Sequence, residues 1–157
     1  MKVRIRKPHK IGFFALLLGL LGFGGCQLIS PEMYGSPTAL FSVKGKVTDE
    51  QGNPIQNLEV NLYGVDSYEG QDYVIPNYRE PARTDKTGTF FIEMSDSPFT
   101  TVQVNVQDVD GAANGGEFAS DSVRTSNYSF LKDKTDKNMW SVGKADITIP
   151  DIRLKKK

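Results

Sequence analysis

Apolar and polar residues alternate along several short segments of this 157-residue chain. In residues 41–48 (FSVKGKVT), Phe41, Val43 and Val47 lie on one side of the alternation and mainly polar residues lie on the other. A period of two is typical of a half-buried β-strand, because successive side chains of a strand point to opposite faces. The same period predicts strands in four further segments: residues 58–64, 89–94, 101–106 and 145–154.

Turn-forming residues separate these segments. Residues 49–54 (DEQGNP) and 85–88 (DKTG) combine glycine with Asp, Asn or Pro, which favour tight turns. Gly45 falls on the apolar side of its segment, where we expect close backbone packing or a bulge, and Pro150 is compatible with an edge strand or a bulge. Short strands with turns between them are typical of a sandwich.

Three longer stretches have no clear period. Residues 65–81 predict an irregular connection, residues 117–123 are compatible with one more strand, and residues 124–143 predict a solvated loop or a short exposed helix. No segment has the period of an amphipathic helix. The sequence therefore predicts an all-β fold, a single antiparallel β-sandwich domain over residues 41–157.

The N-terminal residues have the composition of an export signal. Residues 2–10 carry five Lys or Arg and no acid, residues 11–23 are apolar or glycine, and two glycines and Cys26 follow. This order is typical of a secretion signal, and the apolar run would span only about 20 Å as a helix, which is too short to cross a bilayer. The segment is similar to a bacterial lipobox, although Phe23 stands where Leu is usual.

The likeness to a lipobox predicts three parts of the chain. Residues 1–25 are a lipoprotein signal peptide, residues 26–40 are a lipidated tether, and residues 41–157 are the domain. Cys26 then carries the lipid, with acyl chains such as palmitate, and becomes the mature N-terminus. Gln27, in place of Asp, resembles lipoproteins sent to the outer membrane, on either its periplasmic or its surface face. The alternatives are an ordinary secretion signal with an incidental thiol, or an uncleaved anchor.

Removal of the signal would change the charge and the chemistry of the chain. Residues 1–25 hold five of the 19 Lys and Arg and none of the 19 Asp and Glu, so the remainder has a net charge of −5. A negative net charge does not favour binding to nucleic acid, which is itself anionic. Cleavage also removes His9, the only histidine, and lipidation blocks the only thiol. Triads, Cys–His dyads, His or Cys zinc sites and iron–sulfur clusters are then excluded, and we expect no enzyme and no catalytic residue.

Two segments resemble carboxypeptidase-regulatory-like domains. Residues 43–55 (VKGKVTDEQGNPI) match a Gly-x-Val strand followed by an acidic-Gly-x-Pro turn, and residues 84–90 (TDKTGTF) match a Thr-Asp-x-x-Gly-x-Phe turn into a strand. The resemblance implies a transthyretin-like, Greek-key β-sandwich of about seven strands.

A further resemblance covers most of the chain after the signal. The lipobox, residues 33–37 (MYGSP), residues 43–55 and residues 108–118 (DVDGAANGGEF) are together similar to the radical SAM-associated lipoproteins. The genes of that family accompany a radical SAM enzyme. The resemblance implies a small exported protein that belongs to, neighbours or is modified by such an enzyme system.

The loop after residue 107 is a candidate calcium site. Asp108, Asp110, Asn114 and Glu117 could converge, with Asp121 as a further ligand, because calcium prefers six to eight oxygen ligands on a flexible loop. The spacing departs from that of an EF-hand. The alternative is a hairpin loop whose Asp and Asn side chains cap its own backbone.

Three tyrosines form a second candidate site. Tyr68, Tyr73 and Tyr78 alternate with acids and amides, a combination that can bind sugars, and long loops on a sandwich collect binding residues. The alternative is that these rings pack against the edge of a sheet.

Together these features predict a non-catalytic, lipid-anchored β-sandwich that acts as a binding or structural module of the cell envelope. The alternatives are an exported client that a partner radical SAM enzyme modifies, or a surface module for calcium or carbohydrate.

Overall fold

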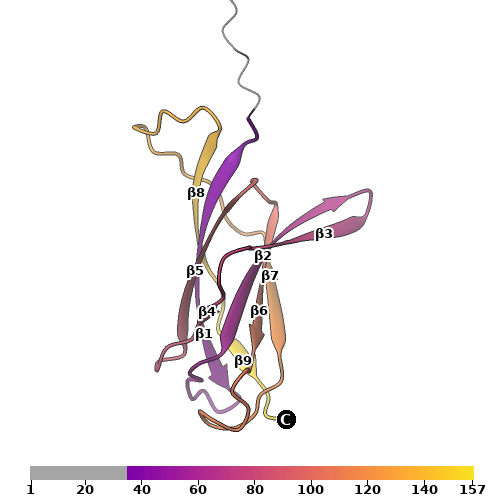
Figure 1. The fold of residues 1–157 in the computed structure, drawn as a ribbon, viewed down its shortest axis with the longest axis vertical. Coiled ribbons are helices and arrows are strands. Elements are labelled where there is room, and N and C mark those ends of the chain that lie inside the picture. The colour runs from indigo at the N-terminus through magenta and orange to yellow at the C-terminus, as the bar shows by residue number, and fades with distance from the viewer. Residues whose placement is uncertain (1–34) are drawn as a thin grey trace, which may run out of the picture. The chain divides into compact units, whose positions relative to one another are not determined.

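The computed structural model describes residues 35–157, and residues Ser36–Lys157 form one compact unit. Within this range the chain forms nine strands and no helix, and the strands make two sheets (Figure 1). The predicted all-β sandwich is confirmed. The predicted signal peptide, Cys26 and the tether as far as residue 34 lie outside the described residues.

The first sheet is built around β1 (Thr38–Asp49). On one side β5 (Thr89–Asp96) pairs with it in antiparallel orientation. On the other side β8 (Ser141–Thr148) and β9 (Ile152–Leu154) follow one another along β1, both parallel to it. Pro150 lies in the gap between β8 and β9, as expected of a residue that has no N–H to donate to a sheet.

The second sheet is built around β2 (Glu59–Tyr68). Its neighbours are β3 (Gln71–Pro76) and the short β4 (Ala82–Arg83) on one side and β6 (Thr101–Gln107) on the other. The last strand, β7 (Asp121–Thr125), pairs with β6. All pairs in this sheet are antiparallel, so the prediction of antiparallel pairing holds for this sheet but not for the β1–β8 and β1–β9 pairs.

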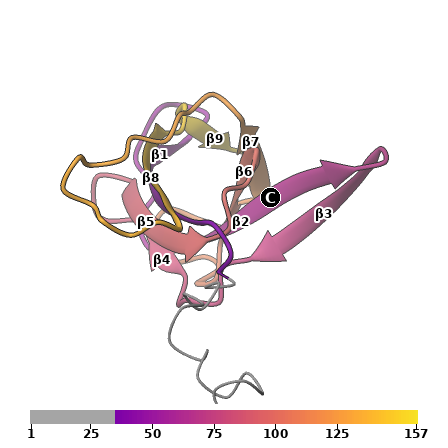
Figure 2. The ribbon, with the colours of Figure 1, turned by 90° about the horizontal axis from the view of Figure 1, so that it is seen from above.

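The prediction of an irregular connection over residues 65–81 is wrong as far as residue 76 and holds only for residues 77–81. β2 continues to Tyr68 and turns back into β3 through Glu69 and Gly70, which have φ values of 51° and 79°. Two positive φ angles are typical of the type I′ turn, whose twist matches that of a hairpin. Figure 2 shows this β2–β3 hairpin extending away from the other strands of the sandwich.

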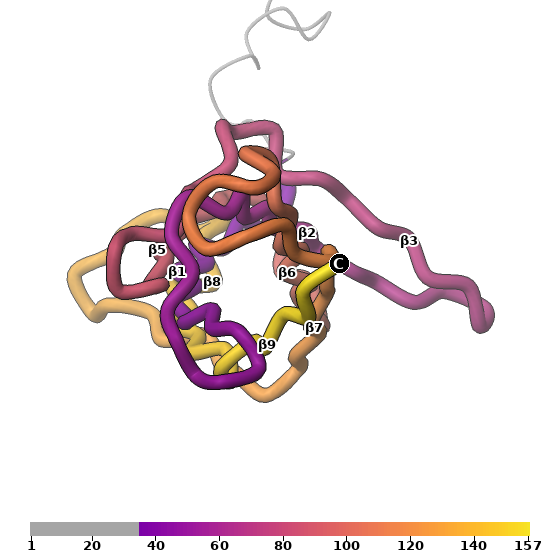
Figure 3. The backbone as a smooth tube through the Cα atoms, turned by 90° about the horizontal axis from the view of Figure 1, so that it is seen from below, coloured from indigo at the N-terminus to yellow at the C-terminus, as the bar shows by residue number. Residues whose placement is uncertain are grey.

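Other predicted boundaries shift by a few residues. β1 begins at Thr38, so the last three residues of the predicted tether (26–40) belong to the sandwich. Only the end of the predicted strand at residues 117–123 falls in β7, while Phe118 instead bridges to Lys156 near the C-terminus. Figure 3 shows this C-terminal segment beside β7. Residues 126–140 form a loop without a helix.

The two turns that carry the carboxypeptidase-regulatory-like resemblance pack against each other. Asp49 and Asp85 each accept two backbone N–H groups of their own turn, at 2.8–2.9 Å. The turns are joined by a hydrogen bond of 2.8 Å from the Val47 N–H to the Gly88 carbonyl. Gly88 has a φ of 73°, and a Cβ there would lie 2.3 Å from the Val47 oxygen, so this position requires glycine.

The core lies between the two sheets and consists of the inward-facing residues of the alternating segments. Gly45 faces this core, as expected, and a Cβ there would lie 2.6 Å from the ring of Phe90. Nearby, the Phe41 ring stacks on Phe99 with centroids 5.8 Å apart. Tyr128 and Phe130 meet Phe41 edge-on, with centroids at 5.9 and 5.4 Å. Such pairs add about 0.5–1.5 kcal/mol each beyond the burial of their apolar area.

Candidate binding surface

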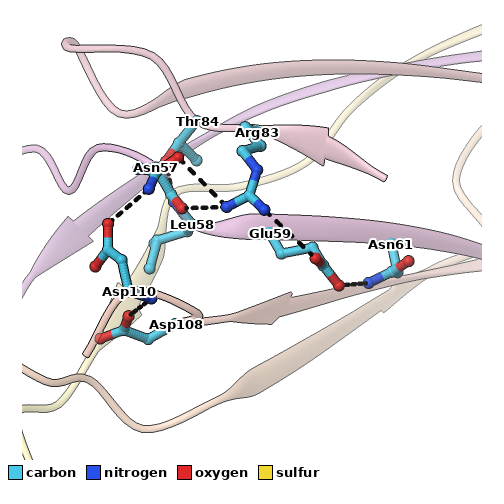
Figure 4. A network of polar contacts seen from close by, with 8 residues as sticks. All are labelled: Asn57, Leu58, Glu59, Asn61, Arg83, Thr84, Asp108 and Asp110. Carbon is cyan, nitrogen blue, oxygen red and sulfur yellow. Dashed lines mark hydrogen bonds and ion pairs between the residues drawn. The ribbon is translucent and has the colours of Figure 1, made fainter. Parts of the chain in front are cut away.

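A network of polar contacts lies at the end of β2 where Glu59 begins the strand (Figure 4). Asn57 is at its centre, with a φ of 65° that asparagine tolerates. Its Nδ2 donates to Asp110 Oδ2 at 2.7 Å, and Arg83 donates to its backbone and side-chain oxygens at 3.2 and 3.3 Å. Arg83 also forms an ion pair of 3.8 Å with Glu59. Most of these side chains are satisfied by one another, so the network fixes the start of β2.

The Asp108 side chain holds the backbone of the candidate calcium loop. Asp108 Oδ1 accepts the N–H groups of Asp110 and Gly111 at 3.1 Å, and its Oδ2 accepts the Phe118 N–H at 2.8 Å. Asp110 Oδ2 accepts the side-chain amides of Asn57 and Asn114 at 2.7 and 2.6 Å. The bonds from Asn57 first, and then from Asn114, hold the pKa of Asp110 below its ordinary value.

The four predicted calcium ligands divide into two groups. Asp110 and Asn114 are in direct contact and Asp108 is bonded to the same loop, but Glu117 forms an ion pair of 2.9 Å with Lys157. Among residues 35–157 no cluster of three or more His, Cys, Asp or Glu side chains is arranged to hold a metal ion. Asp108 caps the backbone of its own loop, whereas Asp110 accepts side-chain amides, and calcium binding there stays a prediction.

The three candidate tyrosines are exposed but do not form one group. Tyr68 and Tyr73 lie on the β2–β3 hairpin, 66% and 50% exposed, whereas Tyr78 is 88% exposed in the following loop. Tyr73 pairs with Asp66 and Tyr68 with Gln71, so the two rings are diagonal neighbours on one face of the hairpin. Diagonal neighbours in an antiparallel pair are about 7–8 Å apart, within reach of one bound ring-shaped group. We call Tyr68 and Tyr73 the tyrosine pair.

The opposite face of the same sheet carries a row of polar side chains that sequence reasoning did not single out. On this outer face Arg124 of β7 donates to Gln103 Oε1 at 2.6 Å and contacts Asp72 of the hairpin, while Gln103 donates to Asn105 at 2.7 Å. Ser67 donates to Asp72 at 2.7 Å. These bonds connect β7, β6 and the hairpin. The alternating polar positions of residues 101–107 (TVQVNVQ) indicate a polar outer face. They do not indicate which side chains bond to that face, because a partner such as Arg124 is distant in sequence.

The surface depressions of the described residues are shallow. One of about 280 Å³ lies beside the start of β1, lined by residues that include Thr38, Asp133, Asp136 and Asn138. Another of about 300 Å³ lies along the β6 and β7 edge near Asn105. In the described part of the chain no helix is both long and apolar enough to span a membrane.

No family model and no curated protein sequence matches this chain. Three solved structures with a similar arrangement are 1,2-dioxygenases by name. For 3-chlorocatechol 1,2-dioxygenase from Rhodococcus opacus 1CP, identity is 13%, coverage is 80% of this chain and 62% of that chain, and the TM-score is 0.44. Hydroxyquinol 1,2-dioxygenase from Pseudomonas putida DLL-E4 is 13% identical, with coverage of 80% of this chain and 58% of that chain and a TM-score of 0.42. Chlorocatechol 1,2-dioxygenase from Pseudomonas putida is 14% identical, with coverage of 92% of this chain and 82% of that chain and a TM-score of 0.45.

These similar structures are enzymes, which overturns the expectation that this chain is not one. That expectation excluded only histidine and thiol chemistry, and it left carboxylates, lysines and tyrosines available. The chain spans about 60% of the length of the first two of these enzymes. With identities of 13–14% and TM-scores of 0.42–0.45, the likeness assigns neither an activity nor a catalytic residue to this chain.

Proposed function

We propose that this chain is a β-sandwich module of the bacterial cell envelope, anchored by a lipid on Cys26, that binds carbohydrate through the tyrosine pair. The observation that carries the proposal is the exposure of Tyr68 and Tyr73 on one face of an extended hairpin. Rings that do not pack into a core are available to stack on the apolar faces of sugars, and neighbouring Asp66 and Gln71 offer hydrogen-bonding groups to hydroxyls.

The hairpin is also held firmly enough to present these rings. Its type I′ turn fixes the register of β2 and β3, and Asp72 is fixed from the opposite face by Ser67 and Arg124. A surface that is ordered before binding loses less conformational entropy when a ligand binds.

Binding of glycans tests the proposal. The chain is extracted from bacterial membranes, and its affinity is measured for immobilised cell-envelope and host polysaccharides. For a glycan that binds, we expect the Tyr68→Ala/Tyr73→Ala variant to lose at least about tenfold in affinity, because truncation of an aromatic anchor costs about 2 kcal/mol. Tyr78→Ala is the matched control, since Tyr78 is more exposed but lies outside the pair. Equal binding by the double variant and the wild type would contradict the proposal.

The anchor is tested separately by the intact mass of the membrane-extracted chain. A mass explained by residues 26–157 plus a lipid on Cys26 supports the anchor, and Cys26→Ser should abolish the lipid mass. An additional shift on an internal residue would instead favour the alternative in which a radical SAM enzyme modifies this chain.

A further inference from the structure

The loop between β7 and β8 has an unusual surface. We call residues 126–140 the return loop. It exposes two large apolar side chains, Leu131 at 75% and Met139 at 79%. Lys132, Lys134 and Lys137 lie between them in sequence. In helices that lie in a membrane interface, apolar side chains enter the bilayer while lysines face the headgroups, and the return loop exposes both kinds of side chain.

The return loop is held at the end of the sandwich where β1 begins. The Thr38 N–H donates to the Trp140 carbonyl at 2.8 Å. Leu131 exchanges two backbone hydrogen bonds with Lys144 of β8, at 2.8 and 3.0 Å. Gly143 permits this approach, because a Cβ there would lie 2.4 Å from the Leu131 oxygen and its φ is 111°. Figure 1 shows the loop beside the start of β1.

The charges of the loop favour an anionic surface. Asp133 and Asp136 turn their carboxylates to the loop's own backbone, accepting the N–H groups of Thr135 and Asn138 at 2.7 and 2.8 Å. Within residues 35–157, neither Lys134 nor Lys137 has a carboxylate partner within 4.0 Å. These two ammonium groups are therefore available to lipid phosphates.

We propose that the return loop lies on the bilayer as a second membrane contact, with Leu131 and Met139 in the interface and Lys134 and Lys137 against anionic headgroups. This inference rests on the proposed lipid on Cys26. Only 11 residues separate Cys26 from Thr38. Even fully extended they span at most about 40 Å, so the lipid would keep this end of the sandwich close to the bilayer. A lipid anchor and a weak surface contact together would fix the orientation of the sandwich on the membrane.

Trp140 is the only tryptophan of the chain and directly follows Met139, so its fluorescence reports on the loop. The full chain is expressed in bacteria, extracted from membranes and reconstituted into vesicles of phosphatidylcholine and phosphatidylglycerol, with or without bromine on the acyl chains near the headgroup. We expect brominated lipid to quench most of the Trp140 emission. Quenching should fall strongly in Leu131→Ser/Met139→Ser, and also in Lys134→Gln/Lys137→Gln. Val109→Ser is the matched control, an exposed apolar residue of the loop after β6.

Flotation of the same vesicles separates this inference from the proposed anchor. Protein that floats with the vesicles while Trp140 is not quenched would overturn the membrane contact and leave the anchor standing. Protein that does not float, and whose mass lacks a lipid, would overturn the anchor. In that case the sole thiol of a chain that begins at Cys26 is coupled to a maleimide lipid, and quenching is measured again. The measurement is repeated on the Met139→Trp/Trp140→Phe variant, in which the tryptophan stands at the exposed position 139. If the emission of this tryptophan is not quenched, that result would also count against the contact.

Discussion

Tyr128 links a long polar loop to the aromatic part of the core. Its ring meets Phe41 and Phe130 edge-on, and its hydroxyl donates to the Phe99 carbonyl at 2.8 Å. Burial, followed by the nearby charge of Asp66, raises the pKa of Tyr128 from 10.0 to about 12. The phenol therefore remains neutral in the folded state over a range in which the unfolded chain loses that proton.

This difference predicts a loss of stability in alkali. Below pH 10 both states hold the proton of Tyr128 and its contribution is constant, whereas between pH 10 and about 12 the unfolded state is favoured progressively. We expect the free energy of unfolding in urea to fall more steeply over this range in the wild type than in Tyr128→Phe. Tyr78→Phe is the control and should behave as the wild type. Identical pH profiles of the wild type and Tyr128→Phe would contradict the assignment.

At the scale of elements, the turn before β5 depends on one carboxylate. Asp85 accepts the Thr87 hydroxyl at 2.7 Å and the N–H groups of Thr87 and Thr89 at 2.8 and 2.9 Å. These bonds, led by that of the Thr87 hydroxyl, hold the pKa of Asp85 below its ordinary value. In the adjoining turn, Asp49 likewise accepts hydrogen bonds from its own turn. The bond from the Asn53 side chain is the main cause of the lowered pKa of Asp49.

Acid should therefore weaken both turns. A lowered folded pKa means that the stabilisation is complete above the unfolded value near 4 and is lost as the pH falls through the folded pKa. We expect Asp85→Asn to lower the melting temperature at pH 7 and to flatten the decrease in stability between pH 4 and pH 2. Glu80→Gln removes the same charge from an exposed loop and serves as the control. A melting temperature of Asp85→Asn equal to that of the control at pH 7 would refute this role.

At the scale of the whole sandwich, the two sheets are joined by residues that belong to no long strand. The Ala119 N–H donates to the Lys155 carbonyl at 2.8 Å, and the Lys157 N–H donates to the Glu117 carbonyl at 2.9 Å. Between these bonds the side chain of Phe118 enters the core and is only 2% exposed. This segment connects the loop after β6 to the residues after β9 and closes one side of the core.

Truncation of this side chain should be costly. Phe118→Ala is expected to lower the free energy of unfolding by about 3–5 kcal/mol, the usual cost of removing a buried phenylalanine ring. Phe91→Ala is the matched control, because Phe91 is exposed on β5, and it should cost less than about 1 kcal/mol. Urea unfolding monitored by circular dichroism measures both. Equal losses in the two variants would show that Phe118 does not close the core.

The alternating segments determined most of the fold by themselves. Residues 89–94 and 101–106 each bury one side and leave the other half-buried or exposed, because the period of two is a local property of the chain. Residues 41–48 bury their apolar side in the same way, but Ser42 and Thr48 of the polar side are buried as well. The turn residues around Asp49 and Asp85 were equally readable, since their side chains bond to backbone within four residues. The wrong prediction over residues 65–81 had a local signal too, the Glu69-Gly70 turn, which was missed because β3 has no buried face.

Other features depend on residues that are distant in sequence, and only the tertiary structure decided them. The parallel pairing of β1 with β8 requires the chain to return to the end where β1 begins, which no period reveals. The ion pair of Glu117 joins it to Lys157, 40 residues away, and no local pattern predicts that partner. The place of the return loop beside Thr38 has the same origin. Local patterns set which residues form strands and turns, whereas packing between distant segments sets which side chains meet and which remain available to bind.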